Sequence, residues 1–239
     1  ARDRAVELGV ELVAGCELSC EVRTGTMHLL VYFVEPGEGP LQDRLAHLQE
    51  VREDRNRRMV DRLRQLGMDV TYDELLAEAG GRGVGRPHAA AVLVRKGIVS
   101  SVQEAFERYL AKGKPGYVEK ERLSPREAVR LAVDSGAKPV LAHPFSLRRT
   151  VDALESVVEE LRGFGLAGLE CLYSRYSPDE REALSRLAQR NGLVATGGSD
   201  HHGSYKPDLS IGVGTGDLNV PDRVLDDLRN AVALRRGRE

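Results

Sequence analysis

Hydrophobic positions along the chain recur with two different periods, and the two periods alternate from residue 124 onward. Helical stretches there are separated by short apolar runs at KPVLAHP (138–144), LAGLECLY (166–173) and LVATGGSD (193–200). Helices that alternate with short apolar strands are typical of a parallel α/β sheet or barrel. Further helices are predicted over 151–164 and from Pro221 to near Gly237.

Start signals support two of these helices. A serine is followed by proline and then, three positions after the serine, by glutamate at Ser124–Glu127 and at Ser177–Glu180. Such a serine and glutamate form a capping box, and proline suits the first turn of a helix. We therefore expect helices to begin at both places.

The first part of the chain is organised differently. VELVAGCELS (10–19) and MHLLVYFV (27–34) are predicted strands, and apolar residues at helical spacing predict one long helix over 41–66. The stretch 68–123 has short helical pieces and the glycine-rich segment GGRGVGRP, but no convincing strand. The chain is therefore expected to divide into an α/β body, residues 1–40 and 124–239, and an all-helical insertion, residues 41–123. Because the first residues resemble the end of a helix, we also expect further sequence upstream.

Composition and charge narrow the classes of function. Of 239 residues, 41% are hydrophobic, and 35 basic residues nearly balance 37 acidic ones. This balance argues against binding to membranes or to extended duplex nucleic acid. No apolar run is long enough to span a membrane, and no secretory signal is visible. The three cysteines form no CxxC pair, so we expect reduced thiols and a cytoplasmic protein.

Residues that can bind metals collect at the predicted strand ends. Glu17, His143, Asp200 and His202 follow or end apolar runs, and His28 lies near the start of another. In parallel α/β folds, functional side chains gather beyond the carboxyl ends of strands. Histidine and carboxylate together suit Zn²⁺, Mn²⁺ or Fe²⁺, and several such ligands suit two or three ions that activate water and bind a phosphate.

Simpler interpretations remain for each residue alone. A histidine at a strand end is more often a hydrogen-bonding residue than a ligand, and Glu17 could be a surface carboxylate. Alternation in an extended segment places Asp200 and His202 on one side and His201 on the other. This D-x-H spacing favours ligation by Asp200 and His202 over the simpler interpretations.

Four short motifs, taken in order, resemble those of the polymerase-and-histidinol-phosphatase (PHP) superfamily. They are G-x-E-L-S (15–19), H-L-L (28–30), A-H-P (142–144) and G-S-D-x-H-G (198–203). The similarity is greatest to the branch that hydrolyses nucleoside 3′,5′-bisphosphates and trims short RNA from its 5′ end. The resemblance implies a distorted (β/α)7 barrel with a helical insertion, here incomplete at its N-terminus because the family's H-x-H and D-H motifs are absent. It implies metal ligation by Glu17, His28, His143, Asp200 and His202, of which His143, Asp200 and His202 are the expected catalytic residues.

The insertion supplies candidate substrate contacts. Arg52, Arg55 and Asn56 recur at i, i+3 and i+4, and Arg86 and His88 flank Pro87 at a predicted helix start. A helix N-terminus with an arginine suits an anion, so Arg52, Arg55, Arg86 and His88 are the candidates for phosphate binding. Solvated surface is the simpler interpretation of arginines on a charged helix.

Three functions are compatible with these observations. The first is metal-dependent hydrolysis of a phosphate ester on a nucleotide or a short RNA end. The second is the same chemistry on another substrate, such as histidinol phosphate. The third is an inactive binding or regulatory module, which only the absent N-terminal motifs favour.

Tyr176 also differs from related sequences, which often have histidine at that place.

Overall fold

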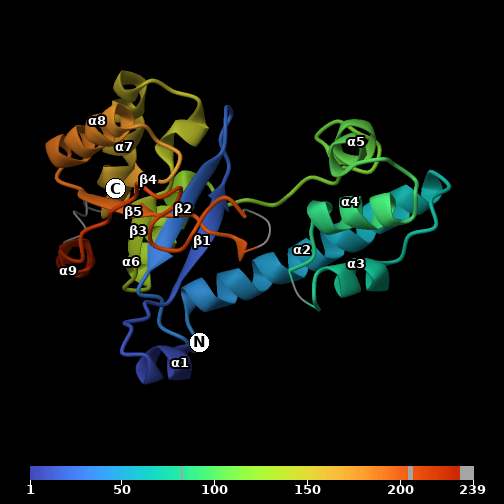
Figure 1. Cartoon of the computed structure of the whole chain (residues 1–239), viewed down its shortest axis with the longest axis horizontal. Helices are drawn as coiled ribbons and strands as arrows, with labels where there is room; N and C mark the ends of the chain where they lie inside the picture. The colour runs from blue at the N-terminus through green and yellow to red at the C-terminus, as the bar shows by residue number, and fades with distance from the viewer. Residues whose placement is uncertain (82, 204–206, 232–239) are drawn as a thin grey trace. The chain divides into compact units, whose positions relative to one another are not determined.

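The computed structural model describes residues 1–81, 83–203 and 207–231 (Figure 1). Contacts along the chain divide it into two compact units. Unit 1 comprises residues 1–41 and 122–239, and unit 2 comprises residues 42–121. Each unit has a core of its own, and each is described separately below.

Unit 1 contains a five-stranded mixed sheet with the strands in sequential order, β1-β2-β3-β4-β5. The three strands after residue 122 run parallel to one another, as expected. The first two do not, because β1 pairs antiparallel with β2, and β2 pairs antiparallel with β3. A short turn joins β1 to β2, and a connection of that length permits only an antiparallel pair. The strands are β1 (Gly15–Cys20), β2 (Met27–Tyr32), β3 (Lys138–Leu141), β4 (Gly168–Tyr173) and β5 (Val194–Gly198).

The described strands form an open sheet, which is flanked by helices. Helix α6 packs against β1, β2 and β3, helix α8 packs against β4 and β5, and helix α9 packs along β5. The predicted end of the last helix near Gly237 lies outside the described residues. The helices of unit 1 are α1 (Arg2–Glu7), α6 (Pro125–Asp134), α7 (Val151–Phe164), α8 (Pro178–Arg190) and α9 (Arg223–Asn230), with a 3₁₀ turn η2 (Pro144–Leu147).

Both predicted start signals form capping boxes. The hydroxyl of Ser124 accepts a hydrogen bond from the backbone of Glu127, and the Glu127 carboxylate accepts one from the backbone of Ser124. Ser177 and Glu180 repeat this arrangement at α8. These bonds satisfy backbone N–H groups that have no partner within the helix, which explains why the helices begin there.

The described residues of unit 2 form helices joined by loops, and no strand. Helix α2 (Pro40–Gln65), which begins at the boundary between the units, is followed by α3 (Tyr72–Glu78), α4 (Arg86–Arg95), α5 (Val102–Ala105) and the π-helical turn η1 (Phe106–Leu110). Their apolar faces meet in one core, in which Leu63, Leu75, Leu93 and Leu110 are fully buried. None of the described helices in either unit has the length and apolar character needed to cross a membrane.

Candidate metal centre

Glu17 and His28 lie on one face of the β1–β2 hairpin. Ser19 pairs with His28 and Glu17 pairs with Leu30, so Glu17 and His28 are diagonal neighbours on that face. Oε1 of Glu17 lies 2.5 Å from Nδ1 of His28. Glu17 was grouped with residues at strand ends, but it lies inside its strand. Strand pairing begins only at Gly15, which places Glu17 within β1.

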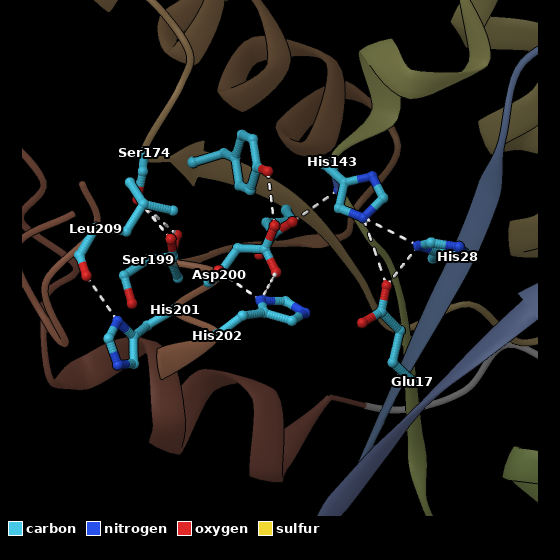
Figure 2. A network of polar contacts seen from close by, with 12 residues as sticks. Glu17, His28, His143, Ser174, Ser199, Asp200, His201, His202 and Leu209 are labelled. Carbon is cyan, nitrogen blue, oxygen red and sulfur yellow. Dashed lines mark hydrogen bonds and ion pairs between the residues drawn. The ribbon is translucent and has the colours of Figure 1, made fainter. Parts of the chain in front are cut away.

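His143 follows β3 and reaches the same two side chains. The backbone N–H of Ala142 donates to the carbonyl oxygen of His28 at 3.0 Å, which holds the end of β3 beside β2. Nε2 of His143 lies 3.2 Å from Nδ1 of His28 and 3.5 Å from Oε1 of Glu17. Figure 2 shows the three side chains turned toward one another from separate elements.

Asp200 and His202 follow β5 and contact each other. Nδ1 of His202 donates to the backbone carbonyl of Asp200 at 2.8 Å and lies 3.3 Å from the carboxylate oxygen Oδ1. The hydroxyl of Tyr173 donates to the other carboxylate oxygen at 2.8 Å. His201 is directed elsewhere, with Nδ1 donating to the carbonyl oxygen of Leu209 at 2.6 Å (Figure 2).

One pocket of about 530 Å³ collects all five of these residues. They come from positions as distant in sequence as β1 and the segment after β5, so only the folded sheet brings them together. Aromatic and hydroxyl side chains complete the wall. The lining residues are Glu17, Thr26, His28, His143, Phe145, Ser146, Tyr173, Tyr176, Asp200 and His202.

The backbone is strained at two of the predicted ligands. His143 has φ of 25° and Asp200 has φ of 53°, in the left-handed region that residues with a side chain rarely adopt. Such a conformation costs on the order of 1–3 kcal/mol and persists only where the surroundings enforce it. The strain therefore indicates that the positions of these two side chains matter more than local backbone energy.

Glu170 and Tyr173, both in β4, contact two of the predicted ligands. Glu170 is buried, and its Oε2 accepts a hydrogen bond from the backbone N–H of His143 at 2.7 Å. A bulge between Glu170 and Leu172 shifts the alternation of β4, so that Glu170 contacts His143 while Tyr173, three residues later, contacts Asp200. The sequence does not reveal these contacts, because nothing in the apolar pattern of β4 indicates a bulge.

The surroundings of Glu17 and Glu170 shift the pKa values of these two carboxyl groups in opposite directions. Contacts of its carboxylate with the rings of His143 and His28 hold the pKa of Glu17 well below its usual range, against the effect of burial. Burial raises the pKa of Glu170 to about 7, with a smaller contribution from the charges of Asp200 and Glu17. Burial lowers the pKa of His143, but the attraction of the protonated ring to Glu17 and to the other surrounding carboxylates outweighs burial and raises it.

The spacing of the cluster formed by Glu17, His28 and His143 suits one divalent cation. Its three ligand atoms all lie within 4.8 Å of one another. Ligands held about 2.0–2.2 Å from an ion in a tetrahedral arrangement are themselves roughly 3.3 Å apart. Two of the distances between these atoms, 3.2 and 3.5 Å, are close to that value, and the third, 2.5 Å, is shorter. The mixture of carboxylate and imidazole is typical of zinc sites.

Relatives of named activity include the following three proteins. The chain is 30% identical to the 5′-3′ exoribonuclease Rnm of Salmonella typhimurium, covering 82% of this chain and 67% of that protein. It is 29% identical to the 3′,5′-nucleoside bisphosphate phosphatase of Chromobacterium violaceum, covering 87% and 73%. It is 31% identical to the phosphoribosyl 1,2-cyclic phosphate 1,2-diphosphodiesterase of Eggerthella lenta, covering 86% and 78%.

Solved structures show the same relationship. A Bifidobacterium adolescentis protein, named as an inferred metal-dependent phosphoesterase, superimposes with a TM-score of 0.76 at 28% identity over 95% of this chain and 79% of that chain. No family model matches the chain. The identity and coverage of the relatives nevertheless decide the family. The chain belongs to the PHP family of metal-dependent phosphoesterases. The α/β fold of this PHP phosphoesterase therefore matches its solved relatives.

Unit 2 of the PHP phosphoesterase holds the predicted phosphate contacts, and several of them make internal contacts. The guanidinium of Arg86 donates to the carbonyl of Leu110 at 3.2 Å and stacks over the rings of Phe106 and Tyr117. Nδ1 of His88 accepts from the backbone N–H of Gly85 at 3.0 Å, which caps α4. These contacts position Arg86 and His88 at the start of α4.

Asn56 has a structural place in α2 of the PHP phosphoesterase. Arg52 is exposed, whereas Asn56, four residues later in the same helix, is fully buried. The side chain of Asn56 donates to the carbonyl of Val84 at 2.8 Å and accepts from Arg55 at 2.7 Å. It therefore joins α2 to the segment before α4.

We expect Asn56→Ala to lower the free energy of unfolding by roughly 1–3 kcal/mol, because it leaves the buried carbonyl of Val84 without its donor. Chemical denaturation measures this loss. Arg52→Ala in the same helix is the control and should change stability by no more than about 0.5 kcal/mol. A loss no larger for Asn56→Ala than for Arg52→Ala would contradict the structural role.

Proposed function

We propose that this PHP phosphoesterase hydrolyses phosphate esters of nucleotides, with nucleoside 3′,5′-bisphosphates and the 5′ ends of short RNA as its substrates. The observation that carries the proposal is the single pocket lined by Glu17, His28, His143, Asp200 and His202. It is supported by relatives named as an exoribonuclease and a bisphosphate phosphatase at 30% and 29% identity.

We further propose that two or three ions of Mn²⁺, Zn²⁺ or Fe²⁺ bind at these five side chains. Glu17, His28 and His143 would hold one ion, since their ligand atoms already cluster. Asp200 and His202 would complete the set from the segment after β5. When bound, such ions lower the pKa of water and neutralise phosphate oxygens.

The residues of the pocket then have distinct tasks. The carboxylates of Glu17 and Asp200 supply negative charge, and the hydrogen bond from Tyr173 keeps the Asp200 carboxylate in one orientation. Glu170 holds the backbone of His143 in its strained conformation through the hydrogen bond to its N–H. These restraints fix the reacting groups before the substrate arrives, which lowers the entropic part of the barrier.

The five strands are proposed to correspond to part of the distorted (β/α)7 barrel that the sequence resemblance implies. Residues 41–123 are proposed as a substrate-binding insertion, in which Arg52, Arg55, Arg86 and His88 bind phosphate. A guanidinium forms bidentate hydrogen bonds with phosphate, and Arg86 lies at the first position of α4, where backbone N–H groups also favour anions.

Substrate comparison tests the proposed function. The purified protein is loaded separately with Mn²⁺, Zn²⁺ or Fe²⁺, and phosphate release is measured from a nucleoside 3′,5′-bisphosphate, a short 5′-phosphorylated RNA and histidinol phosphate. We expect the two nucleotide substrates to be hydrolysed with the higher kcat/KM. Faster hydrolysis of histidinol phosphate would contradict the substrate class, and no hydrolysis with any of the metals would favour a binding module.

Arg86→Ala is expected to raise KM for the bisphosphate about tenfold or more while metal content stays unchanged. Loss of one charge-assisted phosphate contact, at about 1.5–3 kcal/mol, corresponds to this factor. Steady-state kinetics and elemental analysis measure the two quantities. Arg86 also stacks over Phe106 and Tyr117, so its removal changes packing in unit 2 as well. Arg95→Ala, which removes an exposed arginine from the other end of the same helix, is the control. An unchanged KM would remove Arg86 from substrate binding.

A cyclic phosphodiester is the second candidate substrate. The relative from Eggerthella lenta, 31% identical, is named for its action on a phosphoribosyl cyclic phosphate. Both candidates contain a phosphorylated ribose, so the same pocket chemistry suits them. Adding a ribose 1,2-cyclic phosphate to the comparison above separates them by their relative kcat/KM.

A further inference from the structure

Ser146 lies next to the ligand cluster without being a metal ligand of the usual kind. It belongs to the 3₁₀ turn η2, three residues after His143, and it lines the pocket. Its hydroxyl oxygen lies 3.0 Å from Nδ1 of His143 and 2.7 Å from the backbone carbonyl oxygen of Thr26. The other ring nitrogen of His143, Nε2, faces Glu17 and His28.

The number of protons decides how these hydrogen bonds are arranged. A carbonyl oxygen only accepts, so the bond between Ser146 and Thr26 requires the single hydroxyl proton of Ser146. The lone pair of that hydroxyl is then directed to Nδ1 of His143, which must carry a proton in order to donate. A neutral imidazole has one N–H, so Nε2 is left with the lone pair that a metal needs.

Ser146 also restrains the backbone segment that leads to His28. The backbone N–H of Thr26 donates to the carbonyl oxygen of Ser146 at 2.9 Å, so Thr26 and Ser146 are joined by two reciprocal bonds. Strand β2 begins at the next residue, and His28 follows. Ser146 therefore links the segment of His143 to the strand of His28.

We propose that Ser146 is a positioning residue that sets the tautomer of His143, directing the Nε2 lone pair into the Glu17–His28 cluster. The proposal rests on the proposed metal site, to which it adds a supporting group. Ligating histidines commonly donate their second ring N–H to a neighbouring acceptor, and loss of that acceptor typically weakens metal affinity about 10–100-fold. His202 has a comparable arrangement, since its Nδ1 donates to the carbonyl of Asp200.

Two measurements test this role. The first uses ¹⁵N NMR of the metal-free protein, at a pH where the ring of His143 is neutral, to show which ring nitrogen carries the proton. His143→Gln assigns the signal by its disappearance. We expect the wild type to carry the proton on Nδ1 and Ser146→Ala to show a mixture of tautomers. The second measures Mn²⁺ affinity by electron paramagnetic resonance of the free ion, for which we expect a loss of about 10–100-fold in Ser146→Ala.

Ser156→Ala is the matched control, because the Ser156 hydroxyl donates to the backbone carbonyl of Ala153 within α7 and lies outside the pocket. It should leave both the tautomer and the Mn²⁺ affinity unchanged. A wild-type His143 protonated on Nε2 would overturn the proposal whether or not Ser146→Ala folds. An unchanged tautomer in a folded Ser146→Ala would overturn it as well. Failure of the wild type to bind Mn²⁺ would instead contradict the proposed metal site, since the tautomer measurement needs no metal.

Discussion

Asp200→Asn should reduce turnover of a nucleoside 3′,5′-bisphosphate by roughly 1,000-fold. On the proposed role of Asp200, the substitution removes a charged metal ligand and costs several kcal/mol of transition-state stabilisation, and each 1.4 kcal/mol or so is about tenfold in rate. Folding should change little, because the amide has nearly the shape of the carboxylate and its oxygen can still accept from Tyr173. The measurements are kcat, the metal content of the purified protein and its thermal midpoint.

The control for this substitution is Asp152→Asn. Asp152 is exposed in the first turn of α7 and lies outside the pocket, so its variant makes the same chemical change away from the site. We expect it to keep wild-type turnover and metal content. Wild-type phosphatase activity in Asp200→Asn would remove Asp200 from the proposed ligand set.

Gly25→Ala should lower the free energy of unfolding by roughly 2–5 kcal/mol, the largest stability effect that we predict. Gly25 has φ of 72°, a conformation that costs about 1–2 kcal/mol for a residue with a side chain. An added Cβ would also lie 2.4 Å from the carbonyl oxygen of Ser146 and 2.6 Å from the backbone of Leu147, and such overpacking typically costs about 1–3 kcal/mol. Urea denaturation measures the change.

Gly136→Ala separates these two causes. Gly136 has φ of 75°, nearly that of Gly25, but an added Cβ there would meet no atom within 4 Å. We therefore expect only the conformational cost, about 1–2 kcal/mol. Equal losses in the two variants would show that the turn before β2 does not need its close approach to η2. Because that approach also holds Ser146 beside Thr26, Gly25→Ala should weaken Mn²⁺ binding and Gly136→Ala should not.

Local signals in the sequence predicted the helices of unit 1 well. Capping residues act within one turn, so Ser124 and Ser177 mark the starts of α6 and α8 without any knowledge of the rest of the fold. Strand direction and strand length depend instead on partners. Val10 and Leu12 are apolar and were predicted to lie in a strand, but they are exposed and precede the first paired residue of β1. Hydrophobicity alone does not indicate whether a neighbour exists.

The candidate site likewise combines residues that the sequence indicates with contacts that it does not. Residue type and position beside strands were enough to nominate Glu17, His143 and Asp200, which the fold brings into one pocket. The supporting contacts of Glu170 and Ser146 were not predicted. The first depends on a bulge in β4 and the second on a turn 120 residues away in sequence, and neither leaves a periodic pattern. Contacts that depend on tertiary packing were therefore visible only in the structure.

Unit 2 lies between β2 and β3 in the sequence, and this order affects how the cluster of Glu17, His28 and His143 forms during folding. Pairing of Leu29 with Leu141 closes a loop of roughly 110 residues, and an unfolded loop of that length carries an entropic penalty that shorter connections avoid. A helical unit that has already folded within the loop leaves fewer free residues to restrain. Local helix formation should therefore precede the strand pairing that brings His143 beside His28, so that the proposed metal site forms late in folding.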